Sequence, residues 1–347
     1  RPASNGMDYK TKLEELVLTV IREGGSDLHL GASRVPAIRV AGELIFLVKH
    51  HVFTQEDIIG ILSEILSKLK IDKFMEEEEA DFSYDFRGEA RLRGNAFFQK
   101  GLICVVFRLV PQVKTLAELH LPNILADMAR KKHGFFLVVG PVGQGKSTTL
   151  SAMVDLINNE RACNIVTIED PIEHVHVANK SIINQREVGI DTKDFQVALK
   201  SVFREDVNVI LIGEMRNPET IATAVTAAET GHLVLSTLHT NNASQTIDRI
   251  IDSFPGNQQD QIRTQLAASL LGIFSQRLIP RITGGLIPAF ELLLNNNAVS
   301  NLIREKRTHE IDVVIETGTE SGMIDLNRSL MELVRAGEIS IENAHQY

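Results

Sequence analysis

The chain has 347 residues, a formal net charge of −9 and a charged fraction of 23%. This length exceeds what one hydrophobic core normally organises, so we expect two domains. An acidic chain is a poor general partner for nucleic acid, whose phosphates require a basic surface. No apolar run reaches the roughly 18 residues that a membrane-spanning helix needs, so no membrane span is expected.

Two cysteines, Cys104 and Cys163, stand far apart in apolar surroundings. We interpret both as reduced core residues of a cytoplasmic protein. Two cysteines cannot form a four-cysteine zinc cluster, so the sequence predicts no zinc site. No segment resembles a signal peptide, and the residues before Met7 resemble a remnant of cloning, which we exclude from the expected fold.

The first hundred residues mix helical and strand patterns. An apolar face at helical spacing starts at Leu13, and Gly24-Gly25 is expected to end that helix. A second amphipathic helix is expected to be capped by Thr54 and to reach Leu69. Alternating apolar residues predict strands at 27–30, 37–40 and 44–48 and an antiparallel meander over 82–110. Together these elements predict an α+β domain over residues 7–110.

From Phe135 the pattern changes to continuous apolar strands that alternate with helices. Such strands are buried on both faces of a mostly parallel sheet, which is typical of an α/β domain. The expected strands are 136–139, 165–168, 209–212 and 233–236. We expect a linker over 111–122 and the α/β domain over 123–347, with residues 258–347 mostly helical.

The segment from Gly140 to Ser147 fits the phosphate-loop pattern G-x-x-x-x-G-K-[ST] in full. It follows an apolar strand and opens a helix, where glycine N–H groups and the helix N-terminus bind phosphate. This context disfavours the alternative, a glycine-rich turn without a ligand. Lys146 is expected to reach the β- and γ-phosphates, and Ser147 to bind Mg²⁺. The expected nucleotide contacts are Gly140, Gly143, Gln144, Gly145, Lys146, Ser147 and Thr148.

Carboxylates follow two of the apolar strands. Glu214 follows its strand after a single intervening Gly213, where a magnesium-associated carboxylate is expected, and an ordinary strand-end charge is the alternative. Glu169, Asp170 and Glu173 follow a strand that we expect to lie beside the phosphate-loop strand. One of them could orient the attacking water, but the sequence leaves open which one, and a polar turn is the alternative.

Two histidines, His232 and His239, flank the last apolar strand. They could bind a metal ion or sense the γ-phosphate. We discount the metal site, because residues seven apart along a strand do not converge on one ion and no cysteine stands nearby. His174 and His176 alternate on an extended segment without a third ligand, so a structural role is the simpler interpretation.

In combination these motifs resemble the PilT-type secretion-ATPase family, which drives type IV pilus retraction. The resemblance extends from Leu13 to the last helices. The phosphate loop is followed by the family's acidic box, its atypical Walker B segment and its histidine box, at 168–173, 210–216 and 227–240. Shorter segments also match, at 25–30, 185–189, 246–250 and 298–305, the last of which is tied to retraction in this family.

The resemblance implies a PAS-like N-terminal domain and a RecA-like ATPase domain with a helical C-terminal region. It also implies a homohexamer with ATP and Mg²⁺ at the subunit interfaces. Such a ring would lie at the cytoplasmic face of the inner membrane and act on a pilus platform protein. Closure of one subunit on the next would convert hydrolysis into rigid-body motion.

The resemblance also assigns roles to single residues. Glu173 would be the catalytic carboxylate, Glu214 the Walker B residue, and His232 and His239 a pair linked to the γ-phosphate. Arginines of a neighbouring subunit's N-terminal domain would reach the phosphates, since guanidinium groups neutralise the charge of phosphoryl transfer. The matching positions are Arg91, Arg93 and Arg108. Without the resemblance, each would be assigned to a solvated strand face.

Some positions depart from the family pattern. Val142 and Gln144 replace the usual Thr and Ser, and as spacer positions they are expected to leave nucleotide binding intact. Val299 and Ser300 depart within the retraction-linked segment, which leaves details of retraction open. The lack of a four-cysteine motif favours retraction over pilus extension or type II secretion, although relatives without zinc exist.

Three alternatives remain at this point. An extension or type II secretion ATPase is the nearest one. A RecA-like nucleic-acid motor is disfavoured by the acidic charge and by the lack of an aromatic and basic strand-binding segment. An ATP-binding scaffold without hydrolysis is disfavoured by the intact Lys146, Glu173, Glu214 and His239, although slow turnover stays open.

Overall fold

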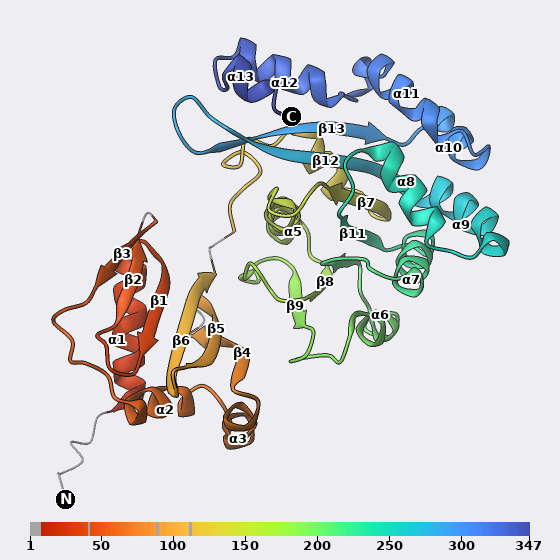
Figure 1. Cartoon of the computed structure of the whole chain (residues 1–347). Coiled ribbons are helices and arrows are strands. Elements are labelled where there is room, and N and C mark those ends of the chain that lie inside the picture. The colour runs from red at the N-terminus through yellow and green to blue at the C-terminus, as the bar shows by residue number, and fades with distance from the viewer. Residues whose placement is uncertain (1–7, 41, 88–89, 111–112) are drawn as a thin grey trace, which may run out of the picture. The chain divides into compact units, whose positions relative to one another are not determined.

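The computed structural model describes residues 8–40, 42–87, 90–110 and 113–347. The chain divides after Gln112 into two compact units, and each is described by itself (Figure 1). Met7, where the first domain is expected to begin, lies outside the described residues, as does the start of the expected linker at 111–112. Within the described parts, no helix is long and apolar enough to cross a membrane.

The first unit is a six-stranded antiparallel sheet with helices packed on one face. The strands are β1 (Gly25–Gly31), β2 (Ala37–Val40), β3 (Glu43–Phe46), β4 (Glu79–Phe86), β5 (Ala90–Gln99) and β6 (Leu102–Val110), in the order β3-β2-β1-β6-β5-β4. The helices are α1 (Tyr9–Arg22), α2 (Gln55–Ser63) and α3 (Lys68–Glu77). Leu13 and Leu16 of α1 pack in one core with Leu28 and Phe107 of the sheet. Since side chains alternate along a strand, the residues next to Leu28 and Phe107 point to the opposite face of the sheet.

The capping box at the start of α2 is confirmed. Thr54 accepts a hydrogen bond from the backbone N–H of Asp57, and Asp57 accepts one from the backbone N–H of Thr54. The expected length of this helix is wrong, because α2 ends at Ser63 and α3 is a separate helix. Ser67 caps α3 by accepting from the N–H of Lys70, and an N-cap serine is a strong start signal.

The second unit is a seven-stranded sheet in the order β13-β12-β7-β11-β10-β8-β9. Six strands run parallel, and β13 pairs with β12 in the antiparallel sense. The strands are β7 (Gly134–Val139), β8 (Asn164–Glu169), β9 (Ile182–Glu187), β10 (Val209–Ile212), β11 (Leu233–Leu238), β12 (Leu270–Pro280) and β13 (Leu286–Leu294). The prediction of a mostly parallel sheet in an α/β unit is therefore confirmed.

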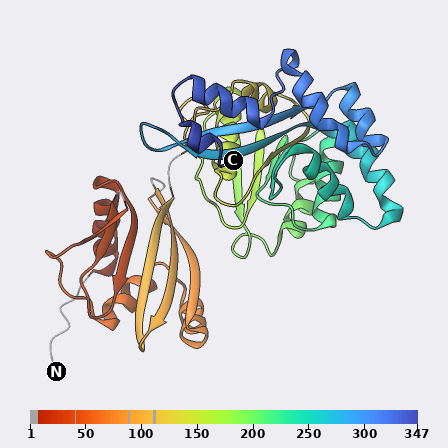
Figure 2. The ribbon, with the colours of Figure 1, turned by 45° about the horizontal axis from the view of Figure 1, so that its top comes forward.

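Helices cover both faces of this sheet (Figure 2). They are α4 (Ile124–Ala129), α5 (Lys146–Glu160), α6 (Phe195–Val202), α7 (Pro218–Glu229), α8 (Ala243–Asp252), α9 (Gly256–Ser269), α10 (Asn297–Arg304), α11 (Ile311–Thr317), α12 (Leu326–Arg335) and α13 (Ile341–Ala344). Phe135 and Leu137 of β7 pack in one core with α6 to α11, whereas Phe136 and Val138 pack in another with α4 and α5. Both faces of β7 are thus buried, which explains its uninterrupted apolar sequence.

Helices α9 to α13 lie in the expected helical region 258–347, but β12 and β13 also form a long hairpin across 270–294 that the sequence did not predict. A short apolar run such as 270–274 does not distinguish a buried strand from a buried helix. The described part of the expected linker, 113–122, belongs to the second unit, where Leu116 and Leu121 are buried in its core.

Candidate functional site

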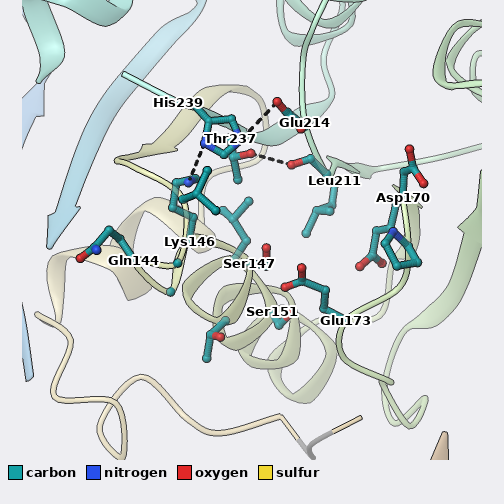
Figure 3. Close-up of a pocket in the computed structure, with 18 of the residues that line it drawn as sticks. Gln144, Lys146, Ser147, Ser151, Asp170, Glu173, Leu211, Glu214, Thr237 and His239 are labelled. Carbon is teal, nitrogen blue, oxygen red and sulfur yellow. Dashed lines mark hydrogen bonds and ion pairs between the residues drawn. The ribbon is translucent and has the colours of Figure 1, made fainter. Parts of the chain in front are cut away.

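A cavity of about 220 Å³ lies at the carboxyl ends of the central parallel strands (Figure 3). Loops that follow β7, β8, β10 and β11 line it, as expected for ligand sites in parallel α/β sheets. It brings together most of the predicted site residues. They are Gly143, Gln144, Gly145, Lys146, Ser147, Thr148, Glu169, Asp170, Glu173, Glu214 and His239.

The strand order differs from one expectation. We expect β8 to lie beside β7, but β11 and β10 lie between them, so that prediction is wrong. The acidic loop still reaches the cavity, because parallel strands end at the same edge of the sheet. Strand adjacency depends on how the helical crossovers are placed, which the strand sequences do not specify.

The phosphate loop joins β7 to α5, and its glycines are required by its shape. Gly143 and Gly145 have φ values of 78° and 76°, in the left-handed region that favours glycine. A Cβ atom on Gly140 would lie 2.5 Å from the backbone oxygen of Gln276. The loop delivers the N-terminus of α5, with its free N–H groups and positive dipole end, to the cavity.

Lys146, the first residue of α5, holds its ammonium group inside the loop. Its Nζ donates to the backbone oxygens of Gly140 at 2.9 Å and Pro141 at 2.8 Å. Burial lowers the pKa of Lys146, while the charges of Glu214 and Glu173 oppose this effect. The ammonium group of Lys146 is therefore close enough to Glu214 and Glu173 for their negative charges to stabilise it.

Lys146, His239 and Glu214 form a continuous chain of contacts (Figure 3). Nδ1 of His239 lies 3.2 Å from Nζ of Lys146, and its Nε2 lies 3.2 Å from Oε1 of Glu214. Since the ammonium group can only donate, Nδ1 accepts and the imidazole proton stands on Nε2, facing the carboxylate. The second oxygen of Glu214 accepts from Arg216. The chain links the phosphate loop to the ends of β10 and β11.

The acidic box divides into a buried and an exposed part. Glu169 is buried, accepts from the hydroxyl of Thr167 at 2.6 Å and lies 3.3 Å from the amide nitrogen of Gln185. Burial raises the pKa of Glu169. Asp170 and Glu173 are exposed at the cavity, and Figure 3 shows the Glu173 side chain extending toward the first turn of α5. Glu173 is therefore the carboxylate better placed to meet a ligand of the phosphate loop.

The loop that carries Glu173 is attached to α5. Nε2 of His174 lies 3.2 Å from the hydroxyl of Thr148, in the first turn of that helix. The amide of Gln185 donates to the backbone oxygen of His174 at 2.8 Å. These contacts hold His174, the residue that directly follows Glu173, in place. The sequence pattern favours a structural role for His174, whereas it marks Gln185 only as the start of the family-matching segment 185–189 and indicates no contact with the acidic loop.

His232 does not reach the cavity. It precedes β11, whereas His239 follows it, and six strand residues separate the two by roughly 20 Å. Its Nδ1 lies 3.0 Å from the backbone oxygen of Ala227, and its ring packs edge-on against Phe203. The prediction that both histidines meet the same phosphate is therefore wrong within one chain, and His232 is a packing residue here.

The three predicted arginines lie in the first unit. Arg91 and Arg93 are alternate residues of β5, and Arg93 pairs in register with Arg108 of β6. Nε of Arg108 donates to Asp27 at 2.8 Å. The three arginines lie on the sheet face opposite the helices, where Arg108 is exposed and Arg91 and Arg93 are half-buried.

The spacer role expected for Gln144 is wrong. Its side-chain oxygen accepts from the backbone N–H of Leu278 at 2.7 Å, and its backbone oxygen accepts from Gln276 at 2.6 Å. Gln276 itself was missed by sequence analysis. The available signal was a polar Gln inside the run Leu270–Pro280, which becomes meaningful once that run is known to be a strand.

A phosphate loop at the end of a buried parallel strand, with a lysine, a serine and carboxylates from neighbouring strand ends, defines a P-loop ATPase. Residues 8–312 match the family described as Type II/IV secretion system protein. The chain belongs to this family, and the interpretation as a PilT-type secretion ATPase that hydrolyses ATP is confirmed.

Similar proteins match almost the whole chain. The chain is 43% identical to the type IV pilus retraction ATPase PilT of Pseudomonas aeruginosa over 335 residues, which are 96% of this chain and 97% of that protein. It is 44% identical to a twitching motility protein of Neisseria gonorrhoeae, over 90% of this chain and 83% of that one. A crystal structure of the pilus retraction motor PilT with bound ADP has 42% identity and a TM-score of 0.88, with 96% of each chain covered.

Proposed function

We propose that this chain is the ATP-driven motor of type IV pilus retraction. The observation that carries the proposal is the linked chain of Lys146, His239 and Glu214 beside the exposed Glu173. It occurs in a chain that resembles a retraction ATPase over 96% of its length. Pilus extension is the alternative, and the similarity to named retraction and twitching proteins favours retraction.

The cavity fits a nucleotide and a magnesium ion. The helix N-terminus and Lys146 would hold the β- and γ-phosphates, and the loop glycines leave room for the backbone to approach them. Ser147 and Glu214 would supply oxygen atoms, the ligand type that Mg²⁺ prefers. When bound, Mg²⁺ neutralises the charge that develops on the phosphates.

Glu173 would orient the water that attacks the γ-phosphate and accept its proton. Its side chain is exposed at the cavity, whereas Glu169 is buried against Thr167 and Gln185. Glu169 would instead hold the acidic loop in place through its hydrogen bonds with Thr167 and Gln185. His239 would report the γ-phosphate to Glu214, because its imidazole contacts both Lys146 and that carboxylate.

The first unit would act in trans as a PAS-like domain. In a homohexamer of RecA-like ATPase units, Arg91, Arg93 and Arg108 would approach the phosphates bound by a neighbouring subunit. Their position on one face of the sheet, with Arg108 exposed, supports this role. The ring would work at the cytoplasmic face of the inner membrane against a pilus platform protein.

The first experiment measures Mg²⁺-dependent ATP hydrolysis of the purified chain together with its oligomeric mass. An assembled ring that hydrolyses ATP supports the motor, and an inert ring that still binds ATP supports the scaffold alternative.

A second experiment sets the direction of force. Deletion of the gene in its own organism should leave cells with surface pili that do not twitch. Loss of surface pili on deletion would assign the chain to extension instead.

A further inference from the structure

A segment of β12 touches both loops that carry the phosphate-linked residues. We call residues 275–278 the β12 brace. In the sheet, β7 lies between β12 and β11, so the phosphate loop emerges between the two other strands. The brace therefore spans from the phosphate loop to the loop that follows β11 and contains His239.

The contacts with the phosphate loop centre on Gln276, a polar side chain that is only 2% exposed. Its amide nitrogen donates to the backbone oxygen of Gln144 at 2.6 Å, and its amide oxygen accepts from the hydroxyl of Thr149 at 2.6 Å. The backbone N–H of Leu278 donates to the side chain of Gln144 at 2.7 Å. The brace thus holds the loop at Gln144 and the first turn of α5 at Thr149.

The contacts with the His239 loop use the alternate residues of the same segment. The hydroxyl of Ser275 donates to the backbone oxygen of Asn241 at 2.7 Å, and Nη2 of Arg277 donates to the same oxygen at 2.9 Å. Asn241 lies two residues after His239. Because a carbonyl oxygen with two donors is held firmly in place, the position of the His239 backbone depends on β12.

Gly140 explains how the brace crosses the phosphate loop. A Cβ atom on Gly140 would lie 2.5 Å from the backbone oxygen of Gln276 and 3.3 Å from Nη1 of Arg277. Nη1 of Arg277 also donates to that backbone oxygen at 2.9 Å. Only a glycine lets the brace pass this close to the loop.

We propose that Gln276 and Arg277 are positioning residues for ATP hydrolysis. Gln276 holds the phosphate loop in its binding shape, and Arg277 holds the His239 loop in register with it. The Arg277 part rests on the proposed role of His239, whereas the Gln276 part requires only that the phosphate loop binds nucleotide. The two parts predict different kinetic signatures, since one residue acts on binding and the other on turnover.

The test uses the full chain with Mg·ADP, to measure the dissociation constant, and Mg·ATP, to measure kcat and KM. Gln276→Leu should weaken Mg·ADP binding about tenfold, because two buried hydrogen bonds to the loop are lost. If this buried substitution prevents folding, Gln144→Ala removes the Leu278 contact from the loop side and should weaken binding severalfold. Unchanged Mg·ADP affinity in a folded variant overturns the role of Gln276.

Arg277→Met should leave Mg·ADP affinity within about twofold and lower kcat about tenfold, with partial recovery in Arg277→Lys, which keeps a cationic donor group but not the guanidinium fork. The matched control is Arg281→Met on the same hairpin, whose partner Glu338 lies away from the cavity, and its kcat should not change. A kcat for Arg277→Met equal to that of the control overturns the role of Arg277. An equal loss of kcat and of Mg·ADP affinity in Arg277→Met would also overturn this role.

The outcome also separates this inference from the proposed function. Mg·ADP binding requires no turnover, so a wild-type chain that binds Mg·ADP but does not hydrolyse ATP would refute the motor proposal while leaving the Gln276 test intact.

Discussion

His239 stands with one imidazole nitrogen 3.2 Å from the ammonium group of Lys146 and the other 3.2 Å from Glu214. A single ring thus joins the cation expected to bind the phosphates to the carboxylate expected near the metal ion. Any displacement of Lys146 by a γ-phosphate changes the contact of the ring and, through it, the charge environment of Glu214.

His239→Ala should therefore lower kcat about 100-fold, as expected when one preorganised polar contact at a reacting phosphate is lost. Mg·ADP affinity should stay within about twofold, because ADP lacks the γ-phosphate that the ring senses. Steady-state kinetics and calorimetry measure the two quantities. His232→Ala is the matched control, since His232 lies at the other end of β11. A similar loss of kcat in His232→Ala would show that both histidines act in ATP hydrolysis.

The two glutamates of the acidic box should separate by the kind of defect. Glu173→Gln keeps the size of the side chain but removes the proton acceptor, so kcat should fall by roughly 10²–10⁴ while ATP still binds and the oligomer persists. Glu169→Gln replaces a buried carboxylate whose pKa is raised by burial, and should retain most activity. A Glu169 variant that is inactive beside an active Glu173 variant would reverse the assignment.

His174 should act through the position of Glu173. His174→Phe fills the same space but cannot bond to Thr148, so kcat should drop about tenfold with a smaller effect on Mg·ADP binding. Thr148→Val removes the same contact from the other side. If the contact matters, the double variant should be no worse than either single variant, and additive losses would contradict the coupling.

The phosphate loop could be predicted from the sequence, because its glycines and its lysine are required locally by one backbone conformation. His232 could also have been placed correctly. A strand that ends at the site has its other end far away, so residues that flank it cannot share a phosphate within one chain. The arrangement of the strands was harder, since helices join parallel strands without specifying which become neighbours. The contacts of Gln276 with Gln144 and Thr149 span more than a hundred residues and depend on that arrangement.

Glu291 should make the stability of the second unit depend on pH. Burial raises the pKa of this carboxyl group from its ordinary value of 4.5 to about 7, with Asp312 and Asp325 adding to the shift, while Arg277 and a hydrogen bond from the N–H of Ala243 oppose it. The folded state therefore binds more protons than the unfolded state between these values, so the free energy of unfolding falls as pH rises from about 5 to 7.

Glu291→Gln removes the ionisation but keeps an oxygen that accepts from Ala243. The variant should match the wild type near pH 5 and be more stable near pH 8, by roughly 1–3 kcal/mol for a shift of this size in a mostly buried group. Thermal unfolding at both pH values measures the difference. Glu342→Gln on α13 serves as the control, because that glutamate is exposed and its substitution should shift the two melting temperatures equally. A stability gain of Glu291→Gln that is the same at pH 5 and pH 8 would show that ionisation of Glu291 is not its cause.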